Sequence, residues 1–306
     1  MLRCLLVLAA IQAPGPQSPN RPIAQSPDST TVILLGTGTP FPDPRAQGPA
    51  TVVTVGQRLF LFDAGPGVER QMTAAGLPVI DGPVTAVFLT HLHTDHTLGL
   101  PDLIFTSWVM GRHVPLPIIG PPGTKAMTDH ILAAWAEDIA IRTGAQGHAI
   151  PGGHRVAVRE VTGGVVYDSA GVRITAIPVL HGDWKVAFGY RIDTPGKTIV
   201  ISGDTRPSPA LERAASGVDI LVHEVYPAVR LTPQVRARGG EDWPRYMHLF
   251  HTSDRELGAI AARARPRLLV LYHIVRMGGT DEELLAGVKE GGFTGRVVVG
   301  KDLQRF

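Results

Sequence analysis

The stretch Val87-Phe88-Leu89-Thr90-His91-Leu92-His93-Thr94-Asp95-His96 carries the strongest signal in the chain. An apolar, β-branched run leads directly into three histidines and an aspartate. Residues two apart in an extended segment point the same way, so His91 and His93 can bind one metal ion together. Asp95 and His96 follow closely and can bind a second ion nearby. A strand that ends in this cluster predicts a centre for two metal ions.

Other apolar runs end in the same kind of residue. A rigid sheet positions the loops at its strand ends, so repeated endings with histidine or aspartate indicate one shared site. These runs lead into Asp204, into His223-Glu224 and into His273, and His181 follows a further predicted strand.

The ligands of such a centre must be histidine and carboxylate, because Cys4 is the only cysteine among 306 residues. The same count excludes an intrachain disulfide and a cysteine-rich zinc site. Imidazole and carboxylate suit zinc. We therefore expect two Zn²⁺ per subunit, with Mn²⁺ or Fe²⁺ as substitutes that accept the same ligands.

The composition is that of a globular enzyme, with 44% hydrophobic and 18% charged residues. The net charge of +2 lacks the basic excess of a dedicated nucleic-acid binder. The 35 glycines and 26 prolines indicate many turns. Short β-branched runs alternate with helical segments in both halves, which predicts an α/β fold of two packed sheets with helices outside.

Individual helices carry start signals. Residues 124–139 are predicted to form one helix with Thr124 as its N-cap, and residues 253–264 another with Ser253 as its cap. The stretch 144–164 is short and mostly strand-like.

The first 29 residues differ from the rest. One positive charge precedes an apolar run that ends at Ile11, and residues 13–29 are rich in Pro, Ser and Gln. This pattern predicts a signal-like leader and linker, and a periplasmic or secreted protein whose hydrolase domain covers residues 30–306. The alternative is a cytoplasmic protein with a flexible N-terminal tail. No other apolar run reaches the length of a membrane span.

The metal motif resembles that of the metallo-β-lactamase superfamily, and its surroundings resemble the ribonuclease Z-like and arylsulfatase-like branch. The resemblance covers about residues 32–273. It implies the four-layer αββα sandwich of that superfamily, with two mixed β-sheets flanked by helices. The matching motifs are Leu34–Pro40, Phe62–Gly65, His91–His96, Gly203–Thr205, His223-Glu224, His251–Ser253 and His273.

The resemblance also implies roles for these residues. A hydroxide between the two metals would be the nucleophile, and His251, oriented by Glu224, would protonate the leaving group. Asp63 would orient the metal-binding loop, and Asp95 counts with His251 and Glu224 among the catalytic residues. The first metal would take His91, His93 and His181, the second Asp95, His96 and His273, and Asp204 would bridge both.

The substrate is less defined than the centre. Between His96 and His181 the sequence has no clear equivalent of the long arm with which tRNA-processing enzymes of this branch grip tRNA. With the leader and the low charge, this favours a small anionic ester, an aryl sulfate or phosphodiester, and argues against nucleic acid. Trp184, Trp243 and Tyr246 are then weak candidates for an apolar pocket wall or, equally, for core packing.

Three alternatives stay open beside that prediction. They are a tRNA 3′-processing endonuclease, a lactone or β-lactam hydrolase as a side activity, and a metal-free binding module. Relatives of this branch are often dimers, so a homodimer is also an expectation.

Overall fold

The computed structural model describes residues 29–78, 84–232 and 242–306, and these build two facing β-sheets. In the six-stranded sheet the first three strands are antiparallel and the remaining pairs are parallel. Its strands are β1 (Thr30–Gly36), β2 (Ala50–Val55), β3 (Arg58–Phe62), β4 (Ala86–Phe88), β5 (Leu116–Gly120) and β6 (Val156–Glu160).

The seven-stranded sheet is mixed in the same way. Its strands from β7 to β10 pair antiparallel, and those from β10 to β13 pair parallel. They are β7 (Gly164–Ser169), β8 (Val172–Val179), β9 (Ala187–Asp193), β10 (Thr198–Ile201), β11 (Ile220–Val225), β12 (Leu268–Ile274) and β13 (Arg296–Val299).

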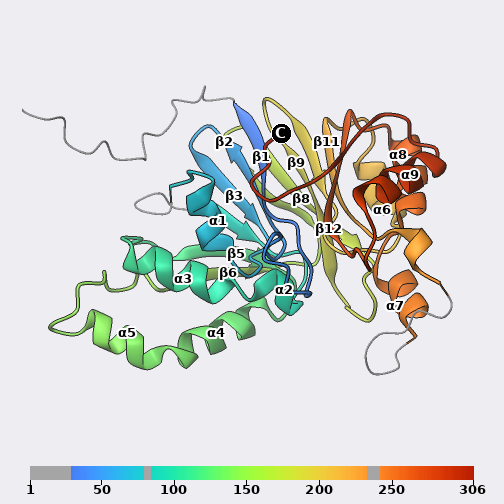
Figure 1. Cartoon of the computed structure of the whole chain (residues 1–306). Helices are drawn as coiled ribbons and strands as arrows, with labels where there is room; N and C mark the ends of the chain where they lie inside the picture. Colours follow the sequence, from blue (N-terminus) through green and yellow to red (C-terminus); the bar gives the residue numbers. More distant parts are fainter. Residues whose placement is uncertain (1–28, 79–83, 233–241) are drawn as a thin grey trace, which may run out of the picture.

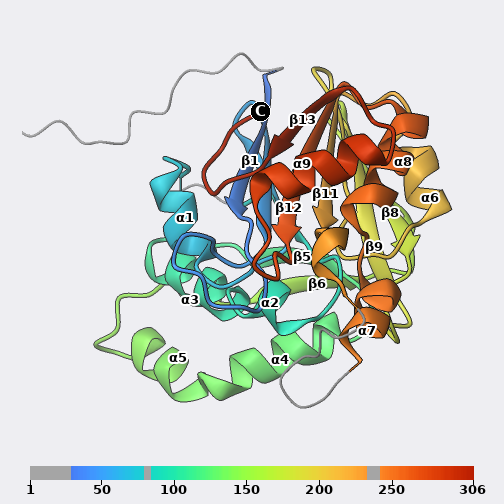
Figure 2. The same ribbon diagram turned by 45° about the vertical axis from the view of Figure 1, so that its right-hand side comes forward.

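Helices cover the outer faces of both sheets, as Figures 1 and 2 show. Beside the first sheet lie α1 (Val68–Ala74), α2 (Thr94–Thr97), α3 (Leu100–Val109), α4 (Thr124–Ala134) and α5 (Ala136–Thr143). Beside the second lie α6 (Pro209–Ala214), the 3₁₀ turn η1 (Ala228–Arg230), α7 (Trp243–Phe250), α8 (Asp254–Ala264) and α9 (Asp281–Glu290). The predicted four-layer αββα sandwich with two mixed sheets is therefore confirmed.

The period of two along each strand divides the apolar residues between these layers. In β1, Val32 and Leu34 belong to the core between the sheets, whereas Ile33 and Leu35 face the helices. The rings of Phe62 and Phe88 stack at 5.1 Å between the sheets. Across the same core the Tyr190 hydroxyl of β9 donates to the Leu89 carbonyl at 2.7 Å, which fastens the second sheet to the start of the metal motif.

The segment after β13 returns to the first sheet. Val32 and Phe306 exchange two backbone hydrogen bonds, so β1 does not present a bare edge there. One carboxylate, Asp302, accepts from the amides of Thr37 and Gln47 and from the side chain of Gln71. These contacts hold in place the loop that follows β1, from Thr37 to Gln47.

Several local predictions need correction. The single helix expected over 124–139 is two helices, α4 and α5, which meet at Trp135. Thr124 is not the N-cap, because Gly123 takes that position with a φ of 102°, and the Thr124 hydroxyl donates to the Pro121 carbonyl. Ser253 is confirmed as a cap and forms a capping box with Glu256.

Five elements of the described residues were not predicted from the sequence; they are α2, β5, β7, η1 and α7. Apart from Ser29, the predicted leader lies outside the described residues. Within the part of the chain that the structure describes, no helix has the length and apolar character that a membrane crossing needs.

Candidate metal centre

The predicted metal ligands gather at one edge of the sandwich, where α2 lies between the ends of the two sheets (Figure 1). The segment after β4 supplies four of them, and α2 begins within it. From the second sheet, His181 follows β8, Asp204 follows β10 and His273 lies in β12. The side chains form two groups, His91, His93, His181 and Asp204, and then Asp95, His96 and His273, each with donor atoms within 4.8 Å of one another.

In the first group three imidazole rings point at one another. Nδ1 of His93 lies 2.9 Å from Nε2 of His91 and 3.1 Å from Nε2 of His181. His91 and His181 are fully buried. Burial lowers the pKa of His91 well below its usual value and that of His181 to about 3, so both rings are neutral and offer lone pairs.

The second group pairs histidines with carboxylates. Oδ2 of Asp95 lies 3.2 Å from Nε2 of His273 and 3.6 Å from Nε2 of His96. Asp204 lies between the groups, since its oxygens are 3.4 Å from His96, 3.5 Å from His273 and 3.8 Å from His181. Its position matches that of a ligand shared by two ions.

The electrostatics of the second group also fit a cation. Burial opposes charge, yet Asp204 and Asp63 raise the pKa of His96 well above its usual value. Burial would raise the pKa of Asp204, but His273 and His96 hold it well below the ordinary range. The carboxylates thus keep buried protons on these rings, and a metal ion would displace them, as metal binding generally does.

Several buried atoms of the centre find no hydrogen-bond partner among the described residues. These atoms are Nε2 of His96, Oδ1 of Asp204 and Nδ1 of His273. Unpartnered buried polar atoms are costly unless an unseen water or ion satisfies them. Together with the all-histidine-and-carboxylate donor set, they show that the residues fit two divalent cations such as zinc.

Asp63 contacts the metal motif from beneath. Its carboxylate accepts from the Thr90 amide at 2.8 Å and lies 2.8 Å from Nδ1 of His96. The Thr90 hydroxyl in turn lies 3.0 Å from Nδ1 of His91. Asp63 adopts a left-handed φ of 59°, a conformation that costs free energy and concentrates at functional sites. These contacts leave the Nε2 atoms of both histidines directed into the centre.

Close backbone packing holds this loop. A methyl group on Gly65 would lie 2.6 Å from the Asp95 carbonyl and 2.4 Å from Gly48. Only glycine at position 65 allows the loop Asp63–Gly65 to approach the metal motif this closely.

Glu224 and His251 form a buried pair beside the centre. The Glu224 carboxylate accepts from the amides of Thr205 and Thr252, and its second oxygen lies 3.4 Å from Nδ1 of His251. Burial raises the pKa of Glu224 well above its usual value and lowers that of His251 to about 4. Both shifts favour the neutral forms of the two groups, and neither Oε2 of Glu224 nor Nδ1 of His251 has a hydrogen-bond partner among the described residues.

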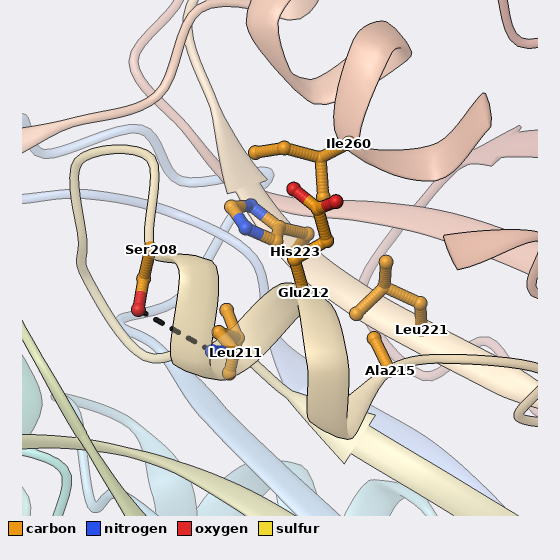
Figure 3. Close-up of a pocket in the computed structure, with 7 residues that line it drawn as sticks. All are labelled: Ser208, Leu211, Glu212, Ala215, Leu221, His223 and Ile260. Carbon is orange, nitrogen blue, oxygen red and sulfur yellow. Dashed lines mark hydrogen bonds between the residues drawn. The ribbon is translucent and has the colours of Figure 1, made fainter. Parts of the chain in front are cut away.

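His223, the neighbour of Glu224 on β11, faces the other way. Its ring lies among Leu211, Leu221 and Ile260, between α6 and α8, in a hollow with no room for a water molecule (Figure 3). The strand period explains this, because successive side chains point to opposite faces. Of the pair, only Glu224 belongs to the centre.

A cavity of about 540 Å³ opens beside the centre. Trp184 lines it, and its indole donates to Nε2 of His93 at 2.9 Å. Trp243 and Tyr246 are not among the lining residues; their rings stack on each other at 5.1 Å within α7.

Other lining residues were not identified from the sequence. Phe250 stacks on Tyr246 at 4.3 Å and lines the cavity, and Lys185 and Val186 extend the wall from Trp184. The helical spacing of Trp243, Tyr246 and Phe250 could have revealed Phe250. Lys185 carried no signal beyond its position next to Trp184.

Comparisons with known proteins agree with this geometry. The family model of the beta-lactamase superfamily domain matches residues 58–274. The chain is 39% identical over 280 residues to ribonuclease Z of Mycobacterium bovis (strain BCG / Pasteur 1173P2), covering 90% of this chain and 96% of that protein. Ribonuclease Z of Mycobacterium marinum is 38% identical, with coverages of 90% and 97%.

Solved structures share the fold. The metallo-beta-lactamase fold protein YhfI from Bacillus subtilis superposes with a TM-score of 0.67 at 20% identity, covering 91% of this chain and 99% of that one. The short form of human tRNase Z, ELAC1, superposes with a TM-score of 0.62 at 22% identity, with coverages of 90% and 98%. The chain belongs to the metallo-β-lactamase superfamily of metal-dependent hydrolases and, within it, to the ribonuclease Z family.

Proposed function

We propose that this protein is a zinc-dependent endonuclease that removes the 3′ trailer from precursor tRNA. The observation that carries the proposal is the 39% identity to a ribonuclease Z across nearly the full length of both proteins. The convergence of all seven predicted donor side chains on one edge of the sandwich supports it, because that arrangement supplies the metal chemistry such cleavage needs.

The proposed metal ligands fall into the two groups that the distances between their donor atoms define. His91, His93 and His181 would hold the first cation, Asp95, His96 and His273 the second, and Asp204 both. When bound, the cations make water more acidic and balance the negative charge of the phosphodiester. The residues do not distinguish zinc from Mn²⁺ or Fe²⁺, and zinc is preferred here because of the histidine-rich set.

In this proposal His251 donates a proton to the leaving group, and Glu224 orients its ring. Water loses a proton to the solvent and forms a bond to phosphorus, and the bond between phosphorus and the upstream 3′-oxygen breaks. That oxygen takes a proton from His251 and leaves as a 3′-hydroxyl, while the trailer keeps a 5′-phosphate. After the products leave, a proton from the solvent restores His251. Glu224 lies 3.4 Å from Nδ1 of His251 and would orient the ring for general acid catalysis.

This proposal reverses the ranking made from sequence alone, which placed a small aryl sulfate or phosphodiester first and argued against nucleic acid. The comparisons support the tRNA alternative better and give no support to aryl sulfate hydrolysis. The lack of a recognisable arm does not weigh against tRNA, because this chain already spans 96–97% of the mycobacterial relatives named ribonuclease Z. The short stretch 144–164 therefore does not separate the chain from that family.

Cleavage assays on the zinc-loaded protein test the proposal. We expect precursor tRNA to be cut at the 3′ end of its acceptor stem, and chelation to abolish the cut. Bis(p-nitrophenyl) phosphate should be a slow substrate, and an aryl sulfate should not turn over. Efficient turnover of the aryl sulfate with intact precursor tRNA would overturn the proposal.

The exported location indicated by the leader stays a prediction, and it conflicts with a tRNA substrate. Cell fractionation with an antibody to the folded domain tests it. Recovery in the cytoplasmic fraction would agree with tRNA processing.

A further inference from the structure

The 540 Å³ cavity is built from both halves of the molecule, and His93 separates it from the metal centre. On the remaining sides lie Pro122 before α4, Phe250 of α7 and the segment 183–186 between β8 and β9. Its size falls within the range of about 300–1,000 Å³ that small-molecule sites occupy. Because His93 is a wall of the cavity and a proposed metal ligand, an occupant would lie within one nucleotide of the phosphate at the centre.

Aromatic rings provide most of the wall. The Trp184 ring lies 5.1 Å from His93 at an interplanar angle of 83°, whereas the Phe250 ring is nearly parallel to His93 at 22°. The two aromatic walls therefore meet at a steep angle. Phe250 is held in place by stacking on Tyr246 at 4.3 Å and by edge contact with His181 at 5.0 Å.

Two charged residues stand beside the rings. Lys185 and Asp183 both line the cavity and are exposed, on either side of Trp184. A lysine ammonium attracts phosphate or ring oxygen, and a carboxylate accepts hydrogen bonds from the amino groups at a base edge. A bare aryl ester would use the lysine but would leave Asp183 without a partner.

We propose that this cavity receives one nucleobase next to the scissile phosphate, stacked against Phe250 or Trp184, with Lys185 and Asp183 at its polar edge. The proposal rests on the proposed nuclease function and deepens it. Stacking on aromatic side chains is the usual way proteins hold an unpaired base, and it tolerates any base. The cavity thus favours a single-stranded nucleotide at the cut over a paired one.

A binding experiment tests the cavity without catalysis. The probes are cytidine 5′-monophosphate and ribose 5-phosphate, which share the sugar phosphate and differ in the base, titrated into the zinc-loaded protein by calorimetry. We expect the nucleotide to bind about tenfold tighter, a gain in keeping with one stacked base. Equal affinities would overturn the proposal.

Variants locate the binding. Val186→Trp fills the cavity without removing a proposed metal ligand, so it should abolish the tenfold difference and raise KM for precursor tRNA about tenfold while kcat falls less. Val165→Trp, at an exposed position of β7 in the seven-stranded sheet, is the matched control and should change neither. Lys185→Gln should weaken nucleotide binding a few-fold, with Lys301→Gln as its control.

The outcomes separate the two proposals. If precursor tRNA is cut but Val186→Trp leaves the nucleotide preference intact, the cavity proposal is wrong and the nuclease function stands. If the preference exists and disappears in Val186→Trp while no tRNA is cut, the base-binding cavity stands and the nuclease function is wrong.

Discussion

The two halves of the molecule supply the candidate centre in different ways. The first half contributes four donors from six consecutive residues, His91 to His96, directly after β4. The second half contributes three, each from a different strand end. The first set can be recognised in a short window of sequence, whereas the second becomes a set only when the sheet has formed.

The halves also hold their donors differently. In the first half one carboxylate, Asp63, fixes both Thr90 and His96, so the whole loop depends on it. In the second half no single side chain among the described residues supports all three donors. Nδ1 of His181 meets the Phe250 carbonyl at 2.8 Å, and His273 is held at a left-handed φ of 41°. We therefore expect a change beneath the first set to weaken the binding of both metal ions. A change in the second set should weaken the binding of one ion.

The largest expected effect comes from Asp204, the residue that faces both groups. Asp204→Asn keeps the size but removes the charge that both cations would share, so the cleavage rate should fall on the order of a thousandfold. Metal analysis should find fewer than two ions per chain. Asp129→Asn, an exposed aspartate of α4, is the control. Two bound ions with an unchanged rate would show that Asp204 is not shared.

A smaller loss is expected at the proton-donating pair. His251→Asn should lower kcat for precursor tRNA about a hundredfold, the lower end of the range for general acid catalysis. Bis(p-nitrophenyl) phosphate has a leaving group that needs no proton, so its rate should fall much less. Glu224→Gln should show the same substrate pattern in weaker form. An equal loss on both substrates would contradict proton donation by His251.

The next effect sharpens the contrast between the halves. Asp63→Asn should weaken metal binding about 10- to 100-fold, as changes to groups that orient metal ligands do. Because Asp63 supports the whole first-half loop, both ions should be affected, whereas His181→Ala should weaken only one. Competition with a zinc chelator measures this. If Asp63→Asn released one ion and retained the other at full affinity, the loop would not act as a unit.

The last prediction concerns stability rather than activity, at Glu69 of α1, which is 3% exposed. Neither of its carboxyl oxygens has a hydrogen-bond partner in the described part of the chain. Burial raises the pKa of Glu69 from 4.5 to about 8, with Asp102 adding to the shift. Between these values the folded protein holds one more proton than the unfolded chain, so its stability falls as pH rises.

The variant Glu69→Gln removes this titration. From pH 5 to pH 8 the unfolding free energy of the wild type should fall by up to about 1.4 kcal/mol per pH unit relative to the variant, and the gap should level off above pH 8. Urea unfolding at several pH values measures it. A constant gap across this range would mean that Glu69 does not titrate as its burial indicates.

Sequence patterns and family resemblance together anticipated most of the fold and the residues of the candidate centre. The strand ends could be predicted because a histidine or aspartate that stops an apolar run is visible within a few residues of sequence. The break between α4 and α5 at Trp135 could not be predicted, because the residues on both sides of it favour helix. Nothing in the local sequence marks the point where the chain changes direction.

The cavity was also only partly foreseen. Trp184 adjoins a histidine of the centre and was found, but Phe250 reaches the cavity through the packing of α7. Trp243 and Tyr246 carry the same aromatic signal and point elsewhere, since side-chain direction depends on how α7 is docked.

The placement of donors on both sheets has a consequence for the lifetime of the protein. Ions held jointly by residues of the two halves would act as cross-links between them, so each binding event would add to the cohesion of the sandwich. Zinc supply would then govern how long a molecule survives proteolysis as well as how fast it cleaves its substrate.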